Sequence, residues 1–103
     1  KCKPYITARK YYFYARTLLD QGKYDRAIDM FKRSVSLTPK HIDGSYRSYL
    51  ADIGYNIAVA HHRAGRNRKA QRWLRSALRM DPRNPQAQHL ERQIQTSSRS
   101  QLR

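Results

Sequence analysis

Two segments of this chain carry the same pattern 43 residues apart, GKYDRAIDMFKRSVSLTP at residues 22–39 and GRNRKAQRWLRSALRMDP at residues 65–82. The matched positions are Gly22 with Gly65, Ala27 with Ala70, Phe31 with Leu74, Ser34 with Ala77, and Pro39 with Pro82. A pattern that recurs at a fixed spacing predicts stacked repeats, in which each unit buries its apolar face against the next. Such repeats usually bind other molecules and seldom catalyse reactions.

The composition is that of one small, strongly basic domain. With 103 residues, 39% of them hydrophobic, the chain can bury one continuous core. The 22 Lys and Arg against seven Asp and Glu give a formal charge of +15, which attracts polyanions and acidic protein surfaces. We therefore expect an acidic partner.

The cysteine content and the hydropathy indicate where such a protein works. Cys2 is the single cysteine and cannot form an internal disulfide, which favours an intracellular, reducing compartment, with the cytoplasm first. No apolar run approaches the roughly 20 residues that span a bilayer, so we expect a soluble chain without membrane insertion. Because the chain starts at Lys1 and repeat arrays usually need about three units, we also expect a processed product or a piece of something longer.

Hydrophobic periodicity predicts five helices, at residues 7–21, 25–38, 45–64, 67–80 and 84–96. Gly22 and Gly65 end the first and third, Pro39 stops the second, and Asn84 caps the fifth. Gly54 lies inside the third helix at a cost of about 1 kcal/mol relative to alanine, which is tolerable where a neighbouring helix approaches closely. Residues 97–103 show no pattern, and we expect them to be disordered.

These residues resemble the 34-residue unit of tetratricopeptide repeat proteins. Residues 8–41 supply Tyr11, Tyr14, Ala15, Leu18, Gly22, Tyr24, Ala27, Phe31, Ser34 and Pro39; residues 51–84 supply Gly54, Ile57, Ala58, His61, Gly65, Ala70, Leu74, Ala77 and Pro82. The second unit departs early, where Gly54 and His61 stand in place of large aromatics.

The resemblance implies an all-α, right-handed solenoid of about five antiparallel helices. Residues 1–96 would form the domain, with repeat one at 8–41, a lengthened linker or helix at 42–50, repeat two at 51–84 and a capping helix at 84–96. The nine residues by which the 43-residue period exceeds the family unit fall in the 40–50 region, where we favour a longer helix.

The resemblance also implies a concave groove that holds a protein segment. Its candidate residues are Arg9, Tyr12, Arg16, Asp52, Tyr55, Asn56, Val59, His62 and Arg63, with Gln86 and His89 from the capping helix. Some family members clamp the carboxylate end of heat-shock chaperones, but here only Asn56 occupies a clamp position. We reject the chaperone-clamp function.

A row of arginines on the fourth helix is the sharpest functional signal. At 100° per residue, Arg68, Arg72, Arg75 and Arg79 lie within about a 60° arc. The row is flanked by Arg66, Lys69 and Arg83, and residues 61–80 contain seven Lys or Arg and no acid. In the first unit, by contrast, Asp25 and Asp29 can pair with Lys32 and Arg33. The row indicates an external anion, either RNA or an acidic protein; the alternative is a merely solvated face.

Other residue types give weaker signals. Tyr12 and Tyr55 are candidates for the groove, whereas the tyrosines expected to pack in the core are Tyr11, Tyr14, Tyr24, Tyr46 and Tyr49. His61 and His62 point about 100° apart and cannot chelate one metal ion together, so we predict no metal site, and His61 is expected to be a hydrogen-bonded packing residue. No catalytic constellation or cofactor motif is present, and we predict neither enzymatic activity nor a cofactor.

Two functions therefore remain open. The first is a non-enzymatic adaptor in a larger complex, which holds a protein segment in the groove and docks an acidic protein or RNA on the basic face. The second is an accessory domain of a larger enzyme. The runs YYFYARTLLDQGKYDRAIDMF and RSALRMDPR are similar to helical-repeat extensions that follow the catalytic domain of some bacterial and phage glycosyltransferases.

Overall fold

The computed structural model describes residues 3–38 and 44–101, with side-chain surroundings for 7–38 and 46–96. Within these ranges the chain forms five helices and no strand. They are α1 (Lys3–Asp20), α2 (Tyr24–Leu37), α3 (Gly44–Arg63), α4 (Asn67–Met80) and α5 (Pro85–Gln101). This confirms the all-α solenoid of antiparallel helices that the sequence predicts.

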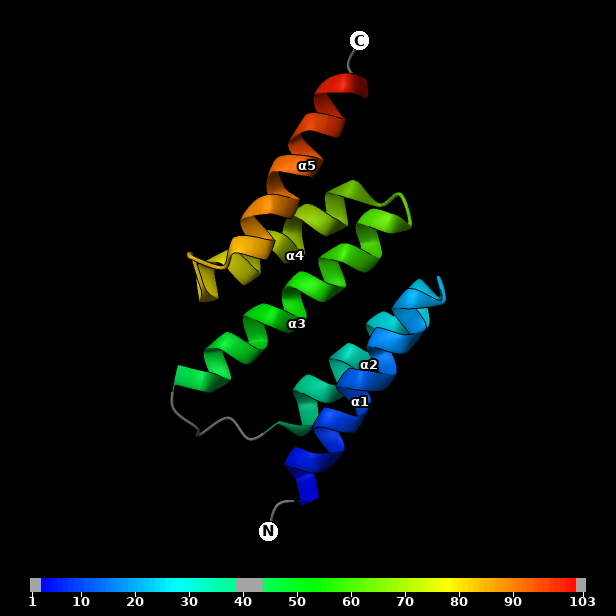
Figure 1. Cartoon of the computed structure of the whole chain (residues 1–103), viewed down its shortest axis with the longest axis vertical. Coiled ribbons are helices and arrows are strands. Elements are labelled where there is room, and N and C mark those ends of the chain that lie inside the picture. Colours follow the sequence, from blue (N-terminus) through cyan, green and yellow to red (C-terminus); the bar gives the residue numbers. More distant parts are fainter. Residues whose placement is uncertain (1–2, 39–43, 102–103) are drawn as a thin grey trace.

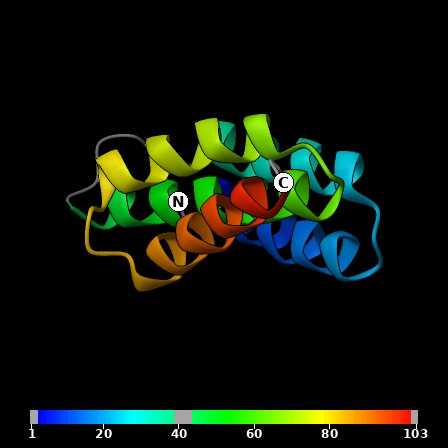
Figure 2. The same ribbon diagram turned by 90° about the horizontal axis from the view of Figure 1, so that it is seen from above.

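The helices stack as two pairs and a fifth helix. α1 packs along α2, and α3 along α4, while α2 contacts α3, and α5 contacts both α4 and α3 (Figure 1). Seen from above, α1, α3 and α5 lie in one layer and α2 and α4 in the other (Figure 2). The described molecule is elongated, 55 × 28 × 16 Å. The first helices of both pairs therefore share one face with α5, and the second helices share the opposite face.

Both turns inside the helix pairs are built in the same way. Gly22 and Gly65 have φ of 79° and 83°, a region that side chains with a Cβ rarely adopt. After α1, the Lys23 N–H donates to the Leu18 carbonyl (2.9 Å); after α3, the Arg66 N–H donates to the His61 carbonyl (2.8 Å). This is the glycine-centred cap that satisfies the last carbonyls of a helix. The two glycines end their helices as predicted.

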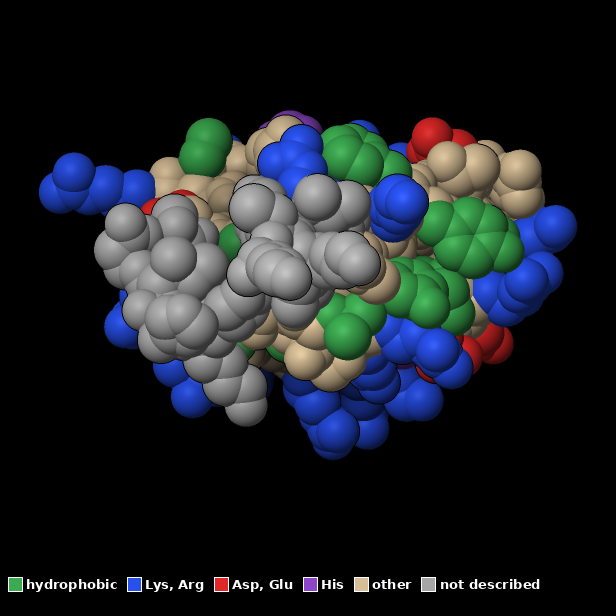
Figure 3. Space-filling model, turned by 90° about the horizontal axis from the view of Figure 1, so that it is seen from below, with side chains coloured by type: hydrophobic (Ala, Val, Ile, Leu, Met, Phe, Trp, Pro, Cys, Tyr) green, Lys and Arg blue, Asp and Glu red, His purple; other side chains and the backbone are tan. Residues whose placement is uncertain are grey.

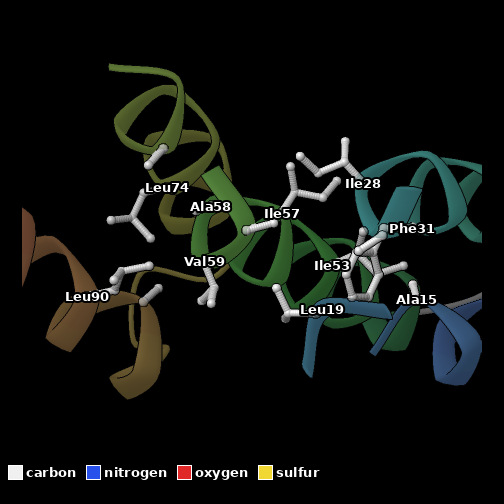
Figure 4. Packing of buried hydrophobic residues seen from close by; sticks show 14 of the residues in the cluster. Ala15, Leu19, Ile28, Phe31, Ile53, Ile57, Ala58, Val59, Leu74 and Leu90 are labelled. Carbon is white, nitrogen blue, oxygen red and sulfur yellow. The ribbon is translucent and has the colours of Figure 1, made fainter. Parts of the chain in front are cut away.

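The core runs through the middle of the stack, with α3 at its centre. Phe31, Ile53, Ile57 and Leu74 are fully buried and come from α2, α3 and α4 (Figure 4). Between α3 and α4 the backbones approach closely, since a Cβ on Gly54 would lie 3.3 Å from the Ala77 Cβ. The close approach expected at this glycine is therefore confirmed.

In the first pair, a serine occupies the position where the second pair has Ala77. Ser34 is fully buried, and its hydroxyl donates to the Ala8 carbonyl on α1 at 2.7 Å. The same hydroxyl forms a hydrogen bond with the Tyr49 hydroxyl on α3. The serine thus links α2 to both neighbouring helices.

Several helix bounds differ from the expectation. α1 begins at Lys3, and α3 begins at Gly44, so residues 44–50 belong to a lengthened helix; residues 39–43 lie outside the described part. α5 begins directly after the predicted cap, Asn84, whose side-chain Oδ1 accepts a hydrogen bond from the Ala87 N–H at 3.0 Å. The disorder expected for 97–103 is wrong for 97–101, because α5 continues to Gln101. No glycine or proline follows Pro85 to stop it.

Tyr14 also departs from its expected place. It matches a packing position of the repeat, yet its side chain is 45% exposed, and its hydroxyl accepts a hydrogen bond from Arg26 at 3.2 Å. With Phe13, which is 54% exposed, it places aromatic surface on the outside of α1. Figure 3 shows hydrophobic side chains exposed on the face that is seen from below, with Lys and Arg around much of its outline.

Candidate partner-binding sites

The layer of α1, α3 and α5 contains a hollow of about 150 Å³. α3 contributes its floor, Arg16 comes from α1, and Gln86 comes from α5. The predicted groove residues that line it are Arg16, Asp52, Tyr55, Asn56, Val59, Arg63 and Gln86, together with Leu19 and Asp20. The structure therefore gathers most of the predicted groove residues of α3 around one space.

The wall between α1 and α3 is a hydrogen-bonded chain. The half-buried Tyr12 donates to the Asp52 carboxylate at 2.6 Å and accepts from the Arg16 guanidinium at 3.2 Å. Burial, followed by the bond to Asp52, raises the pKa of the Tyr12 phenol. The Tyr12 ring also packs edge-on against Phe31, with the ring centroids 5.8 Å apart. Tyr12 thus joins the helices and is not a lining residue of the hollow.

The floor of the hollow is polar on one side and apolar on the other. Asn56 is buried and donates to the Asp52 backbone carbonyl at 2.9 Å, so its amide nitrogen is held by its own helix. Val59 is buried and Tyr55 half-buried. Both signs of charge line the space, with Arg16 and Arg63 against Asp20 and Asp52. The hollow can therefore receive apolar, acidic and basic groups of one bound segment.

Besides Tyr12, three further predicted groove residues do not line the hollow. His62 and His89 line a separate, open hollow between α3 and α5, with Arg92, Gln93 and Thr96. There His62 Nδ1 is 3.0 Å from the Asn67 side-chain oxygen, a partner on the next helix. The Arg9 guanidinium lies over the Phe13 ring, 5.6 Å from its centroid, on α1 itself. The hollow is therefore lined by fewer residues than the groove that the sequence predicts.

The arginine row on α4 is exposed, as are Lys69 and Arg83. Its two middle members face different ways: Arg72 lines a hollow that it shares with Lys32 of α2, whereas Arg75 lines one with Glu91 of α5. The arginine row therefore runs between two hollows, one beside α2 and one beside α5.

Arg66 does not belong to the exposed basic face. It is half-buried, donates to His61 Nδ1 at 3.1 Å and forms an ion pair with Asp25 at 2.7 Å. Asp25 was expected to pair within its own helix. The turn at Gly65 places Arg66 against the first turn of α2, where Asp25 is 82% exposed and accessible to it. His61 is buried and hydrogen-bonded, as predicted.

Sequence reasoning missed a cleft between α2 and α4. It is lined by Val35, Leu50, Ile53, Gly54, Ile57, Trp73, Ser76, Ala77 and Met80, with Lys32. Trp73 reads from the sequence as one more apolar residue of its helix, and the only signal for close packing here is Gly54. Three separate helices build this cleft, so no single period could reveal it.

The described ranges contain neither a cluster of metal ligands nor a membrane-spanning helix. Among the residues that the structure describes, no three His, Cys, Asp or Glu side chains are grouped so that they could hold a metal ion. Nor does any helix there combine the length and hydrophobicity needed to cross a bilayer.

The tetratricopeptide repeat family model matches residues 6–83, which include α2, α3 and α4 in full and most of α1. The chain belongs to the tetratricopeptide repeat family. Proteins of this family generally mediate protein–protein interactions and are typically non-enzymatic scaffolds. No individual curated protein matches this tetratricopeptide repeat chain. The match ends before α5, which packs on the second repeat as an additional helix.

Proposed function

We propose that this tetratricopeptide repeat protein is a non-enzymatic adaptor in a larger assembly. It holds a protein segment in the hollow of the α1, α3 and α5 layer and docks an acidic partner on the arginine row of α4, which consists of Arg68, Arg72, Arg75 and Arg79. The observation that carries the proposal is the hollow itself, because side chains from three helices converge on one space of about 150 Å³. A concave space on which several polar side chains converge can fix the orientation of a bound segment.

The hollow is lined mainly by polar and charged groups, with a smaller apolar part that can hold one side chain of a segment. Tyr55 and Val59 offer apolar surface, and tyrosine is enriched among residues that dominate binding energy. Arg63 is exposed at the edge and can pair with a carboxylate of the segment, while Asp20 can pair with a basic group. The segment therefore carries both signs of charge around an apolar side chain.

A peptide selection tests the groove. A random-peptide phage library is selected on the immobilised chain, and enriched peptides are synthesised and titrated against the wild type, Arg63→Glu and Arg79→Glu. Both substitutions make the same charge change at an exposed site, but only Arg63 lines the hollow. We expect Arg63→Glu to weaken binding by about tenfold, the loss of one good polar contact, and Arg79→Glu to change it little. Equal affinity of all three proteins would refute the groove.

The arginine row supports an acidic partner on the opposite layer. The four arginines of the row on α4 are exposed, and like charges at this spacing disfavour the helix by a few tenths of a kcal/mol each unless something neutralises them. The affinities for RNA and for an acidic protein would depend differently on the salt concentration, because each RNA phosphate that is neutralised adds to the salt dependence of binding. Fluorescence anisotropy with a mixed RNA pool in about 50 mM salt decides the RNA option, which fails if no binding is detected.

A further inference from the structure

An apolar cleft opens on the layer formed by α2 and α4, opposite the groove. It encloses about 180 Å³, with Ile53 and Ile57 of α3 below, Val35 of α2 on one side, and Trp73 and Met80 of α4 on the other. An apolar cavity of about 150 Å³ in a protein takes up a benzene molecule. The cleft can therefore receive one aromatic or branched aliphatic side chain.

A cationic hollow of about 270 Å³ adjoins this cleft. It is lined by Lys32 of α2, His61 of α3, and Lys69, Arg72 and Trp73 of α4, and it shares Lys32 and Trp73 with the cleft. The Lys32 ammonium lies 5.6 Å from the centroid of the Trp73 ring, at the boundary between the two spaces. Among the described residues, no acidic side chain lines either space. The hollow is therefore complementary to an anion.

His61 adds a neutral donor to this hollow. Its burial, then the cations Arg66, Lys69 and Lys32, lower the pKa of the imidazole, while Asp25 opposes them. In the neutral ring, Nδ1 accepts the hydrogen bond from Arg66, so Nε2 carries the hydrogen. Asp25, the acid whose charge acts on His61, is itself paired with Arg66. Three helices thus present positive charge and one N–H group, and no acidic side chain from the described part of the chain lines the hollow between them.

We propose that the cleft and the hollow together, named here the back seam, dock one acidic segment of a partner protein. A large apolar side chain of the segment enters the cleft, and the carboxylate of a neighbouring residue enters the hollow between Lys32, Lys69 and Arg72. The proposal rests on the acidic partner of the proposed function and specifies its chemistry. A nucleic acid fits less well, because a base in the cleft would bury polar edges against apolar walls without partners.

Two labelled peptides test the apolar half of the back seam. They share the sequence Glu-Asp-Glu-X-Glu-Asp-Glu and carry Phe or Ala at X, and their binding is followed by fluorescence anisotropy at about 150 mM salt, where long-range attraction is screened. We expect the Phe peptide to bind about tenfold more tightly than the Ala peptide, because only Phe fills the cleft. Ser76→Phe, which places a ring into the cleft from its own wall, removes this preference and leaves the Ala peptide bound.

A matched pair of charge reversals tests the cationic half. Arg72→Glu and Arg79→Glu are both exposed sites on α4, but only Arg72 lines the hollow. We expect Arg72→Glu to weaken both peptides by about tenfold and Arg79→Glu by less than about threefold. Circular dichroism confirms that both variants remain helical.

Four outcomes separate this proposal from the broader one. Equal affinity of the Phe and Ala peptides, or equal losses in both charge reversals, overturns the back seam while keeping a non-specific acidic partner on α4. No detectable binding of either peptide overturns both. Tighter binding of a single-stranded oligonucleotide of matched charge, sensitive to Arg72→Glu, overturns the protein occupant in favour of RNA. The variant Arg63→Glu must bind the Phe peptide as the wild type does, or the peptide is occupying the groove on the other layer.

Discussion

The Tyr12 hydroxyl and the Asp52 carboxylate, forty positions apart in the chain, are joined by a 2.6 Å hydrogen bond between α1 and α3. The bond lies at the wall of the concave hollow, and Arg16 donates to the same phenol oxygen. The two repeats are therefore held at this face by a charge-assisted contact, in addition to the apolar core.

Replacement of Tyr12 by Phe should destabilise the protein by about 1–2 kcal/mol, because the part-buried Asp52 carboxylate loses its donor. Urea denaturation followed by circular dichroism measures this change. Tyr14→Phe is the control, since its hydroxyl bonds only at the exposed surface and its removal should stay within about 0.5 kcal/mol. Equal changes in the two variants would show that the contact between the repeats contributes no stability.

Ser34→Ala should also destabilise the protein by about 1–2 kcal/mol, although the second repeat has alanine at the matching position. The change deprives the Tyr49 hydroxyl of its partner inside the stack. The double variant Ser34→Ala/Tyr49→Phe should lose less than the sum of the single changes, by about 0.5 kcal/mol or more. Strict additivity in the same urea titrations would show that the two hydroxyls are not coupled.

Gly54→Leu should lower stability by about 1–3 kcal/mol, since even a Cβ at this position meets Ala77 at 3.3 Å. A leucine there must separate α3 from α4 or adopt a strained rotamer. Thermal unfolding of this variant is compared with Ser48→Leu, at an exposed site on the same helix, for which we expect a change within about 0.5 kcal/mol. A melting temperature equal to that of the wild type would show that the close approach is not required.

Stability should fall as the pH drops below about 6.5, the ordinary pKa of histidine, because of His61. Its pKa is lowered in the folded state, so below this pH the unfolded chain binds a proton that the folded chain does not. The loss is complete once the pH passes below the folded-state pKa, where both states are protonated. Above about 6.5 both states are neutral, and this contribution is constant.

Urea midpoints at a series of pH values measure this dependence. The groups that face His61 are Arg66 and Lys69 at the start of α4, with Lys32 and Asp25 from α2. His61→Gln should flatten the profile below about pH 6.5. A wild-type profile in His61→Gln would assign the dependence to another group.

The sequence predicts the helices well because the signals that begin and end them are local. Gly22 and Gly65 stop helices through a backbone conformation that one residue determines, and Asn84 caps α5 through a bond three residues away. The end of α5 is missed because the residues after Thr96 lack an apolar period but also lack a stop.

The binding surfaces are predicted only in part, because their geometry depends on contacts between helices. Tyr55, Asn56 and Val59 share one side of α3 because of the phase of that helix, and all three line the hollow. The surroundings of Tyr12 and Arg66 were not predicted. Each side chain bonds to an acidic residue at least 40 positions away in the chain, which no pattern along one helix reveals.

The central position of α3 bears on how the chain unfolds. This helix contacts α2, α4 and α5 and is bonded to α1 through Asp52, so separating the two pairs would expose Ile53 and Ile57 to water. Without α3, neither the α1–α2 pair nor α4 would have a complete apolar interior. The chain should therefore lose its helices in one cooperative transition, and not pair by pair as longer solenoids can.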